Sequence, residues 1–168
     1  MINIRLLQLG EEEEFIKLKK ESLELIPDYL IDAPYSATPD QVRWLINHPI
    51  GPVITIVLEY AGELLGFCQA NIDVANPKRK HMALIKSMYV RRDDRVAGQR
   101  IGHKITHDLI EYLKTIGVTY ALSGTMIGNH SSEKILADLG FEVIFIDEHF
   151  LLKDDGTYVA SKYWKKLF

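Results

Sequence analysis

The segment from position 88 to position 102 combines residue types that could bind a phosphate group. A β-rich run ends at Val90, a periodic helical run begins at Ile101, and Gly98 and Gly102 lie at the junction. The N–H groups of a first helical turn lack intrahelical partners and meet the positive end of the helix dipole, while glycine permits close backbone approach. We therefore predict an anion site, with a glycine-containing loop of solvated arginines as the alternative. The basic side chains nearby are Arg91, Arg92, Arg95, Arg100 and Lys104.

A second segment, residues 129–141, has the pattern of a short helix followed by a strand. Asn129 or Ser131 is suited to cap the helix N-terminus, and Gly140 is suited to end the helix. Phe141 then opens an apolar run. This unit follows the predicted anion site after one intervening strand.

The histidines and the cysteine give no metal site or nucleophile. His103 and His107 stand four residues apart on one expected helix, a spacing that could hold a metal ion. No glutamate lies between them, so we expect no metal, and His103 is interpreted as a neighbour of bound phosphate. Cys68 is the only cysteine, which excludes an intramolecular disulfide. Its place in an expected central strand favours a small buried hydrophobe over a nucleophile.

Hydrophobic periodicity and turn residues indicate the elements that must position these groups. Thr38, Pro39 and Gln41 form a capping-box signature, and the two prolines between Pro27 and Thr38 indicate a loop. Residues 155–156 favour a turn. The pattern predicts strands over 2–7, 53–60, 63–73, 82–90, 118–123, 141–146 and 158–166, and helices over 11–26, 38–47, 101–116 and 131–139.

The length, composition and net charge limit the class of protein. The chain has 168 residues, of which 47% are hydrophobic and 26% charged, as in an ordinary globular protein, and residues 1–168 are expected to form one domain. The net charge of −3 gives no general attraction to nucleic acid or to an anionic membrane. The first residues lack a signal-peptide pattern, and no apolar run is long enough to span a bilayer. We expect a cytoplasmic protein with no nucleic acid or membrane partner.

Two segments, in this order, resemble the acetyl-CoA-binding core of the GNAT superfamily of N-acetyltransferases. Residues 97–102 are similar to its pyrophosphate loop, which has a Gln/Arg-x-x-Gly-x-Gly/Ala pattern after a strand ending in Val. Residues 129–141 are similar to its Asn-x-x-Ala-x-x-Leu-Tyr-x-x-x-Gly-Phe segment. The likeness is strongest from Met88 to Phe141.

The loop departs from that family pattern. Ala97 occupies the Gln/Arg place and Arg100 occupies the place of the middle glycine. Two extra residues also separate Val90 from the loop. The departures concern the donors to the phosphates rather than the site itself.

The resemblance implies an α/β (α+β) fold, with a mixed, mostly antiparallel twisted sheet, helices on both faces, and a splay between the fourth and fifth strands. It implies acetyl-CoA as the acyl donor and no metal. The residues that it assigns to the cofactor are Met88, Tyr89 and Val90 on the strand edge, Gly98, Gln99, Arg100, Ile101, Gly102 and His103 at the phosphates, and Asn129 at the pantetheine arm.

The implied activity is transfer of an acetyl group to a primary amine of a small molecule, peptide or protein, by direct attack in a ternary complex. Many relatives place a glutamate on the fourth strand to accept the amine proton through water, and a tyrosine on the later helix to protonate the thiolate. Here Lys86 and Leu136 stand at those places. The alternative is a catalytically weak acyl-CoA-binding or sensing domain, which would bind CoA without turnover.

The catalytic groups are therefore unassigned. Asp73, His81 and Glu59 could accept a proton, although each is also explained as a surface or strand-end polar group. Ser132, Tyr120 and His130 could reach the thiolate, although Ser132 is also explained as a first-turn helix residue. The weak candidates are Ser132, Tyr120, Asp73 and His81.

The acceptor is also unassigned. The weakly acidic balance is compatible with a cationic amine. Trp44, Trp164, Tyr29 and Tyr35 are candidates to line the acceptor cleft, with packing as the alternative. The look-alikes commonly form homodimers, so a homodimer is one possibility for this chain, and the sequence identifies no interface.

Overall fold

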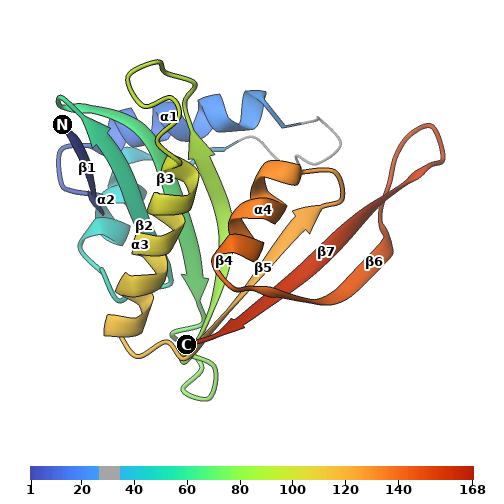
Figure 1. Cartoon of the computed structure of the whole chain (residues 1–168). Coiled ribbons are helices and arrows are strands. Elements are labelled where there is room, and N and C mark those ends of the chain that lie inside the picture. The colour runs from blue at the N-terminus through green and yellow to red at the C-terminus, as the bar shows by residue number, and fades with distance from the viewer. Residues whose placement is uncertain (27–34) are drawn as a thin grey trace.

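All strands belong to one sheet in the computed structural model, which describes residues 1–26 and 35–168 (Figure 1). The strand order is β1-β2-β3-β4-β5-β7-β6. Most of the expected loop after Pro27, with Tyr29, lies outside the described residues. The elements are β1 (Ile2–Leu6), α1 (Glu12–Glu24), α2 (Pro39–Ile46), β2 (Val53–Tyr60), β3 (Glu63–Ile72), β4 (Met82–Val90), α3 (Ile101–Thr115), β5 (Tyr120–Met126), α4 (His130–Asp138), β6 (Glu142–Leu152) and β7 (Tyr158–Leu167).

The sheet is mixed and mostly antiparallel, as predicted. Neighbouring strands run antiparallel except β4 and β5, which are parallel. Two strands differ from their predicted bounds by more than one residue. β5 runs from Tyr120 to Met126, because it pairs with β7 along its whole length. β6 extends to Leu152, because its hairpin with β7 continues well past the apolar run that predicted it.

The sheet buries a separate core on each face, which confirms helices on both. α3 and α4 cover one face, and α1 and α2 cover the other. Phe15 of α1 meets Phe67 of β3 edge to face, with ring centroids 5.5 Å apart. Fully burying a side chain of this size contributes roughly 1.5–3 kcal/mol. None of the helices in the described residues is long and apolar enough to cross a membrane.

Local signals set the start of α2 as the sequence predicted. Thr38 Oγ1 accepts a hydrogen bond from the Gln41 N–H at 3.3 Å, and Gln41 Oε1 accepts one from the Thr38 N–H at 2.8 Å. Pro39 occupies the first turn, where its missing N–H costs nothing. The capped helix packs Val42 into the core that it shares with α1.

β4 and β5 pair over only part of their lengths. Four residue pairs join them, from Met82↔Tyr120 to Ile85↔Ser123, although β4 continues to Val90. In Figure 1 the two strands start side by side near the C-terminus and then spread apart. The splay between the fourth and fifth strands is therefore confirmed. Among the described strands, the second half of β4 pairs only with β3.

A β-bulge changes which way the second half of β4 faces. Gln69 pairs with Ser87 and Ala70 pairs with Ile85, so Lys86 is the extra residue on β4. Alternation would otherwise place Ile85, Ser87 and Tyr89 on one face. Instead Ile85 and Met88 pack into the core beneath α3, while Tyr89 packs into the core beneath α1 and α2. The bulge thus turns Ser87 and Tyr89 toward α1.

Gly66 allows β3 to approach the end of β4 closely. It pairs with Val90. A Cβ at this position would lie 2.8 Å from the Tyr89 carbonyl oxygen and 3.2 Å from the Val90 Cα. Backbone atoms at these distances cannot move aside without shifting a strand.

We expect Gly66→Ala to lower the free energy of unfolding by about 1–3 kcal/mol, because the added methyl group overpacks the β3–β4 contact. Gly124→Ala is the matched control. Its Cβ would meet no atom nearer than 4.0 Å, so its effect should stay below about 1 kcal/mol. Guanidinium chloride denaturation measures both. Equal midpoints for the two variants would show that the close approach at Gly66 does not constrain the fold.

Candidate functional site

The open end of the β4–β5 splay lies beside the N-terminus of α3. The chain leaves β4 at Val90, forms a loop, and enters α3 at Ile101. Beyond Ile85, no strand in the described residues pairs with the β4 edge that faces β5. Backbone N–H and C=O groups on such an edge can pair with an extended ligand.

The first turn of α3 keeps its backbone donors available. Arg100 is the N-cap residue, and no described side chain caps the helix. The first backbone hydrogen bond at this end runs from the Lys104 N–H to the Arg100 carbonyl, at 3.1 Å. The N–H groups of Ile101, Gly102 and His103 precede that bond and have no partner within the helix, so they are available to an anion, and the anion site stays a prediction.

Arg100 adopts a backbone conformation that glycine adopts more easily. Its φ is 53°, in the left-handed region, and Gly98 has a φ of 73°. The structure therefore explains why a glycine suits the middle position of this loop. Arg100 keeps the conformation while its side chain reaches α4, where it donates to Asp138 at 2.8 Å.

Gly102 is where α3 approaches both β4 and α4. A Cβ on Gly102 would lie 2.9 Å from Ile135 Cδ1 and 3.6 Å from Met88 Sδ. Thr106, one turn later, donates to the Gly102 carbonyl at 2.8 Å and places its Oγ1 3.1 Å from Met88 Sδ. The Met88 side chain is thus fixed beneath the helix, which leaves its backbone at the strand edge.

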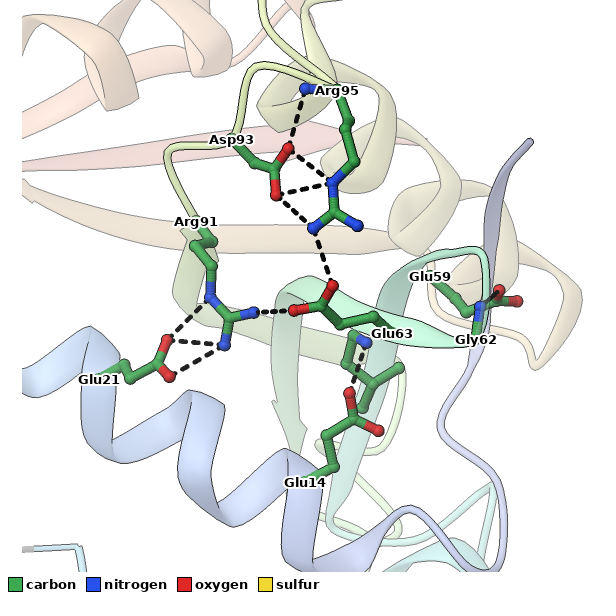
Figure 2. Close-up of polar contacts among 9 residues, drawn as sticks. Glu14, Glu21, Glu59, Gly62, Glu63, Arg91, Asp93 and Arg95 are labelled. Carbon is green, nitrogen blue, oxygen red and sulfur yellow. Dashed lines mark hydrogen bonds and ion pairs between the residues drawn. The ribbon is translucent and has the colours of Figure 1, made fainter.

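Most of the positive charge in the β4–α3 loop is offset by carboxylates. Figure 2 shows the Arg91 guanidinium between Glu21 of α1, with Nε–Oε2 at 3.0 Å, and Glu63 of β3, with Nη1–Oε1 at 2.7 Å. Arg95 donates to Asp93 and to Glu63, the latter at 2.8 Å. Hydrogen bonds from Arg95 lower the pKa of Asp93 to about 2.

These ion pairs attach the loop to α1 and to the β2–β3 hairpin. Glu63 accepts from both arginines, and Glu14 of α1 accepts from the Leu64 N–H at 2.7 Å (Figure 2). Arg92 and Lys104 take part in none of the ion pairs among the described residues, so these two remain available to a phosphate. All five basic residues were candidates from the sequence, because a pair such as Arg91 and Glu21, 70 positions apart, leaves no local signal.

Asn129 caps α4 at the opposite side of the splay. Its Oδ1 accepts a hydrogen bond from the Ser132 N–H at 3.3 Å. Its side-chain nitrogen donates to no group in the described part of the chain. The helix cap and the proposed contact to the pantetheine arm are therefore compatible, because the capping oxygen and the amide N–H₂ belong to one exposed side chain. Gly140 follows the helix with a φ of 82°, as a C-terminal stop requires.

The candidate proton-transfer residues are dispersed. Tyr120 and His81 lie at the start of the paired half of β4 and β5, with ring centroids 5.6 Å apart, and the Tyr120 hydroxyl contacts Met82 Sδ at 2.7 Å. Asp73 follows β3 at the same end of the sheet and lies 4.0 Å from Arg79. These three residues therefore lie at the other end of β4 from Met88.

The remaining candidates occupy two other places. Ser132 lies on the first turn of α4, beside Asn129, and His130 lies there with its Nδ1 3.9 Å from Glu133. Glu59 accepts hydrogen bonds from Asn3 and from the Gly62 N–H in the β2–β3 hairpin. Of the four weak candidates, Ser132 alone lies at the splay.

A cavity of about 500 Å³ opens on the face of the sheet covered by α1 and α2. Its volume is within the range of small-molecule sites. It borders β4 at Lys86 and Ser87, immediately before the edge at Met88. The described residues that line it are Lys19, Tyr35, Ala37, Gln41, Trp44, Leu45, Val53, Gln69, Asn71, Lys86 and Ser87.

Two of the four predicted cleft aromatics line this cavity, namely Tyr35 and Trp44. Trp164 does not, because it is buried in the core beneath α3, where its Nε1 donates to Thr125 Oγ1 at 2.8 Å. That hydrogen bond satisfies the indole N–H, so Trp164 acts as a packing group, the alternative considered for it.

Sequence reasoning missed Lys19, although a signal was present. Lys19 lies four residues after Phe15 and three before Ser22, both buried, so it belongs to the inward face of α1. Its Nζ donates to Gln69 Oε1 at 2.9 Å, and Gln69 donates to Thr55 Oγ1 at 2.9 Å. Burial, followed by the charge of Lys86, lowers the pKa of Lys19 to about 8.

Cys68 is fully buried, as the sequence predicts. Its Sγ lies 3.9 Å from Thr106 Oγ1. Burial raises the pKa of its thiol to about 12, which disfavours the thiolate that a nucleophile requires. In the described residues, no group of three or more histidine, cysteine or acidic side chains could hold a metal ion.

The fold is shared with solved acetyltransferase structures. A GNAT-family acetyltransferase from Streptococcus pneumoniae superposes with a TM-score of 0.85 at 16% identity, over 100% of both chains. The Salmonella typhimurium protein yncA, solved with its cofactor acetyl-CoA, gives 0.80 at 16% identity, over 99% of this chain and 94% of that one. A ribosomal-protein-alanine N-acetyltransferase from Brucella melitensis gives 0.78 at 19% identity, over 99% of both.

Comparison by sequence gives the family. No curated protein sequence matches the chain. The family model described as "Acetyltransferase (GNAT) family" matches residues 18–141, which include the cavity lysines, the β4–α3 loop and α4. The chain therefore belongs to the GNAT family of acetyltransferases.

Proposed function

We propose that the protein transfers an acetyl group from acetyl-CoA to a primary amine. The observation that carries this proposal is the arrangement at the splay. Among the described residues, nothing caps the α3 N-terminus and no strand pairs with the adjacent edge of β4, and a cavity borders the same strand at Ser87. An acyl donor and an acceptor could thus meet at β4.

The donor groups present fit acetyl-CoA, which supplies the acetyl group as a thioester. The N–H groups of residues 101–103 suit the pyrophosphate, and the edge at residues 88–90 suits the amide-containing arm. The Asn129 amide, on α4, suits the same arm from the other side of the splay. Gly98, Gln99, Arg100 and His103 remain proposed contacts at the phosphates.

Positioning of the amine beside the thioester should supply most of the rate acceleration. The described residues that line the cavity include no carboxylate, and Leu136, at the place where many relatives carry a tyrosine, is buried in the core. The amine must be neutral to attack. Orienting amine and thioester alone can remove about 7–11 kcal/mol of barrier. The alternative of a weak acyl-CoA-binding or sensing domain predicts CoA binding without turnover, so release of free CoA decides between them.

We also propose that residues 1–168 act as one domain, because one sheet takes strands from both ends of the chain. A cytoplasmic location is supported by the free thiol of Cys68, which suits a reducing compartment. We propose a homodimer formed through the edge strand β6, which exposes a run of apolar side chains: Val143, Ile144, Phe145 and Ile146.

Acetyl-CoA should stabilise the protein through the first turn of α3. At a hundredfold excess over the dissociation constant the gain should be about 2.7 kcal/mol, a rise of several degrees in Tm. His103→Glu should weaken binding by roughly tenfold, because a carboxylate would repel the phosphates. Gly102 is less suitable for this test, because a side chain there would meet Ile135.

The control for that experiment is His107→Glu, the same change one turn further along α3. It should retain most of the acetyl-CoA-induced shift, measured against each variant's own ligand-free Tm. No shift in the wild-type protein would contradict acetyl-CoA binding. Equal loss in both variants would show that the phosphates do not lie at the first turn.

Single changes at the weak candidates should have modest effects. Ser132→Ala, Tyr120→Phe, Asp73→Asn and His81→Ala should each reduce turnover less than the roughly 10²–10⁴-fold expected for loss of a general acid or base. The rate should rise with pH toward the ionisation of the amine. A pH profile of each variant at saturating acetyl-CoA measures this. A thousandfold loss with unchanged CoA affinity would identify the missing acid or base and contradict the positioning account.

The β6 proposal predicts a dimer mass by light scattering for the wild-type protein. Ile144→Lys should give a monomer, because it would place charges in the apolar interface. Ile50→Lys changes another exposed isoleucine and should remain dimeric. A monomeric wild-type protein, or a dimeric Ile144→Lys variant, would contradict an interface on β6.

A further inference from the structure

The cavity beside β4 carries positive charge that no described acidic side chain in its lining offsets. Lys19 enters it from α1, and Lys86 enters it from the bulge of β4. The other described lining residues are neutral, and the polar ones are Gln41, Gln69, Asn71, Ser87 and Tyr35. This local charge is opposite in sign to the net charge of −3.

The contacts of Lys19 hold it in place without neutralising it. Its Nζ donates to the neutral Gln69 amide at 2.9 Å and lies 4.7 Å from the centre of the Phe67 ring. The Tyr35 ring centre is 6.0 Å away. Neither the phenol nor the amide carries a negative charge, and burial keeps the Cys68 thiol neutral as well.

The charge of Lys86 disfavours the protonated state of Lys19. The charge of Lys86 contributes to the lowered pKa of Lys19, and burial contributes more. By contrast, Arg91 and Arg95 in the nearby loop are each bound by two carboxylates. Two neighbouring cations inside a cavity, for which the described lining residues provide no counterion, form a site where an anionic group would relieve the repulsion.

We propose that the acceptor amine also carries a carboxylate or phosphonate, and that Lys19 and Lys86 bind this anionic group. The inference rests on the proposed acetyl transfer. Lys86 and Ser87 line the cavity and directly precede Met88 on β4. An acceptor whose anionic group is held by the lysines would therefore have its amine near the β4 edge. Tyr35 and Trp44 provide an aromatic surface for an apolar body of the acceptor. Amino acids and aminoalkylphosphonates have this chemistry, whereas polyamines do not.

The test compares matched acceptors. The free L-amino acids leucine, methionine and phenylalanine are assayed against their C-terminal amides and against the corresponding 1-aminoalkylphosphonic acids. CoA release is followed at saturating acetyl-CoA. The rates are measured over a range of pH, so that acceptors can be compared at equal fractions of neutral amine. The anionic member of a pair should have a kcat/KM roughly 10-fold to 100-fold higher, the size expected for one or two charge-assisted contacts. The carboxylate and phosphonate arms show which anion the site prefers.

Variants assign the preference to the two lysines. Lys19→Met and Lys86→Met keep side-chain length and should each remove most of the preference for the anionic acceptor, while acetyl-CoA still raises the Tm. Lys20→Met changes the next residue of α1, which is exposed, and should keep the preference. Equal or better rates with the amides would overturn the anion site while leaving acetyl transfer intact. An equal loss on acid and amide in Lys19→Met would assign Lys19 to proton transfer instead and also overturn it.

A binding measurement separates this inference from the proposed function. Calorimetry of the CoA-bound wild-type protein should detect binding of phenylalanine but not of phenylalaninamide. With the CoA-bound Lys86→Met variant it should detect binding of neither. If phenylalanine binds in this way and no amine releases CoA, acetyl transfer to amines fails and the anion site stands. If neither ligand binds and the acid shows no kinetic advantage, the anion site is wrong.

Discussion

The short parallel pairing of β4 with β5 is the constraint on which the candidate site depends. Parallel neighbours need a crossover, and here the crossover is α3. The helix must therefore begin near the carboxyl end of β4, the end at which the two strands have separated after four residue pairs. Its unpaired N–H groups and the unpaired strand edge consequently face the same opening. α4, which follows β5, brings Asn129 to that opening from the other side.

One extra residue on β4 determines what lies on each side of that edge. With regular alternation, Ile85 and Ser87 would face α3 together. The bulge at Lys86 instead places Met88 beneath α3 and directs Ser87 toward α1. The same strand therefore borders α3 on one face and the cavity on the other. A bulge is set by pairing with β3, so its position depends on contacts between distant parts of the chain.

How much the sequence could predict follows from this distinction between local and distant contacts. The order of elements and the α2 cap depend on residues within a few positions of one another, and they were predicted. The β4–α3 loop has a local motif, and its open helix start and left-handed residues match that motif. The cavity draws residues from α1, α2, β2, β3 and β4, and no local pattern specifies it. Lys19 was the exception, because its place on the buried face of α1 could have been found from helical spacing.

The largest revision concerns charge. The sequence places a cluster of arginines beside the expected phosphate site, yet Glu21, Glu63, Asp93 and Asp138 bind three of them. Phosphate binding in this loop would therefore rely chiefly on backbone N–H groups, which do not depend on side-chain identity. Reliance on backbone groups explains how the loop can differ from the family pattern at Ala97 and Arg100 and still keep its geometry. In the described residues that line the cavity, the positive charge is not offset, so the group best able to use it is the acceptor rather than the cofactor.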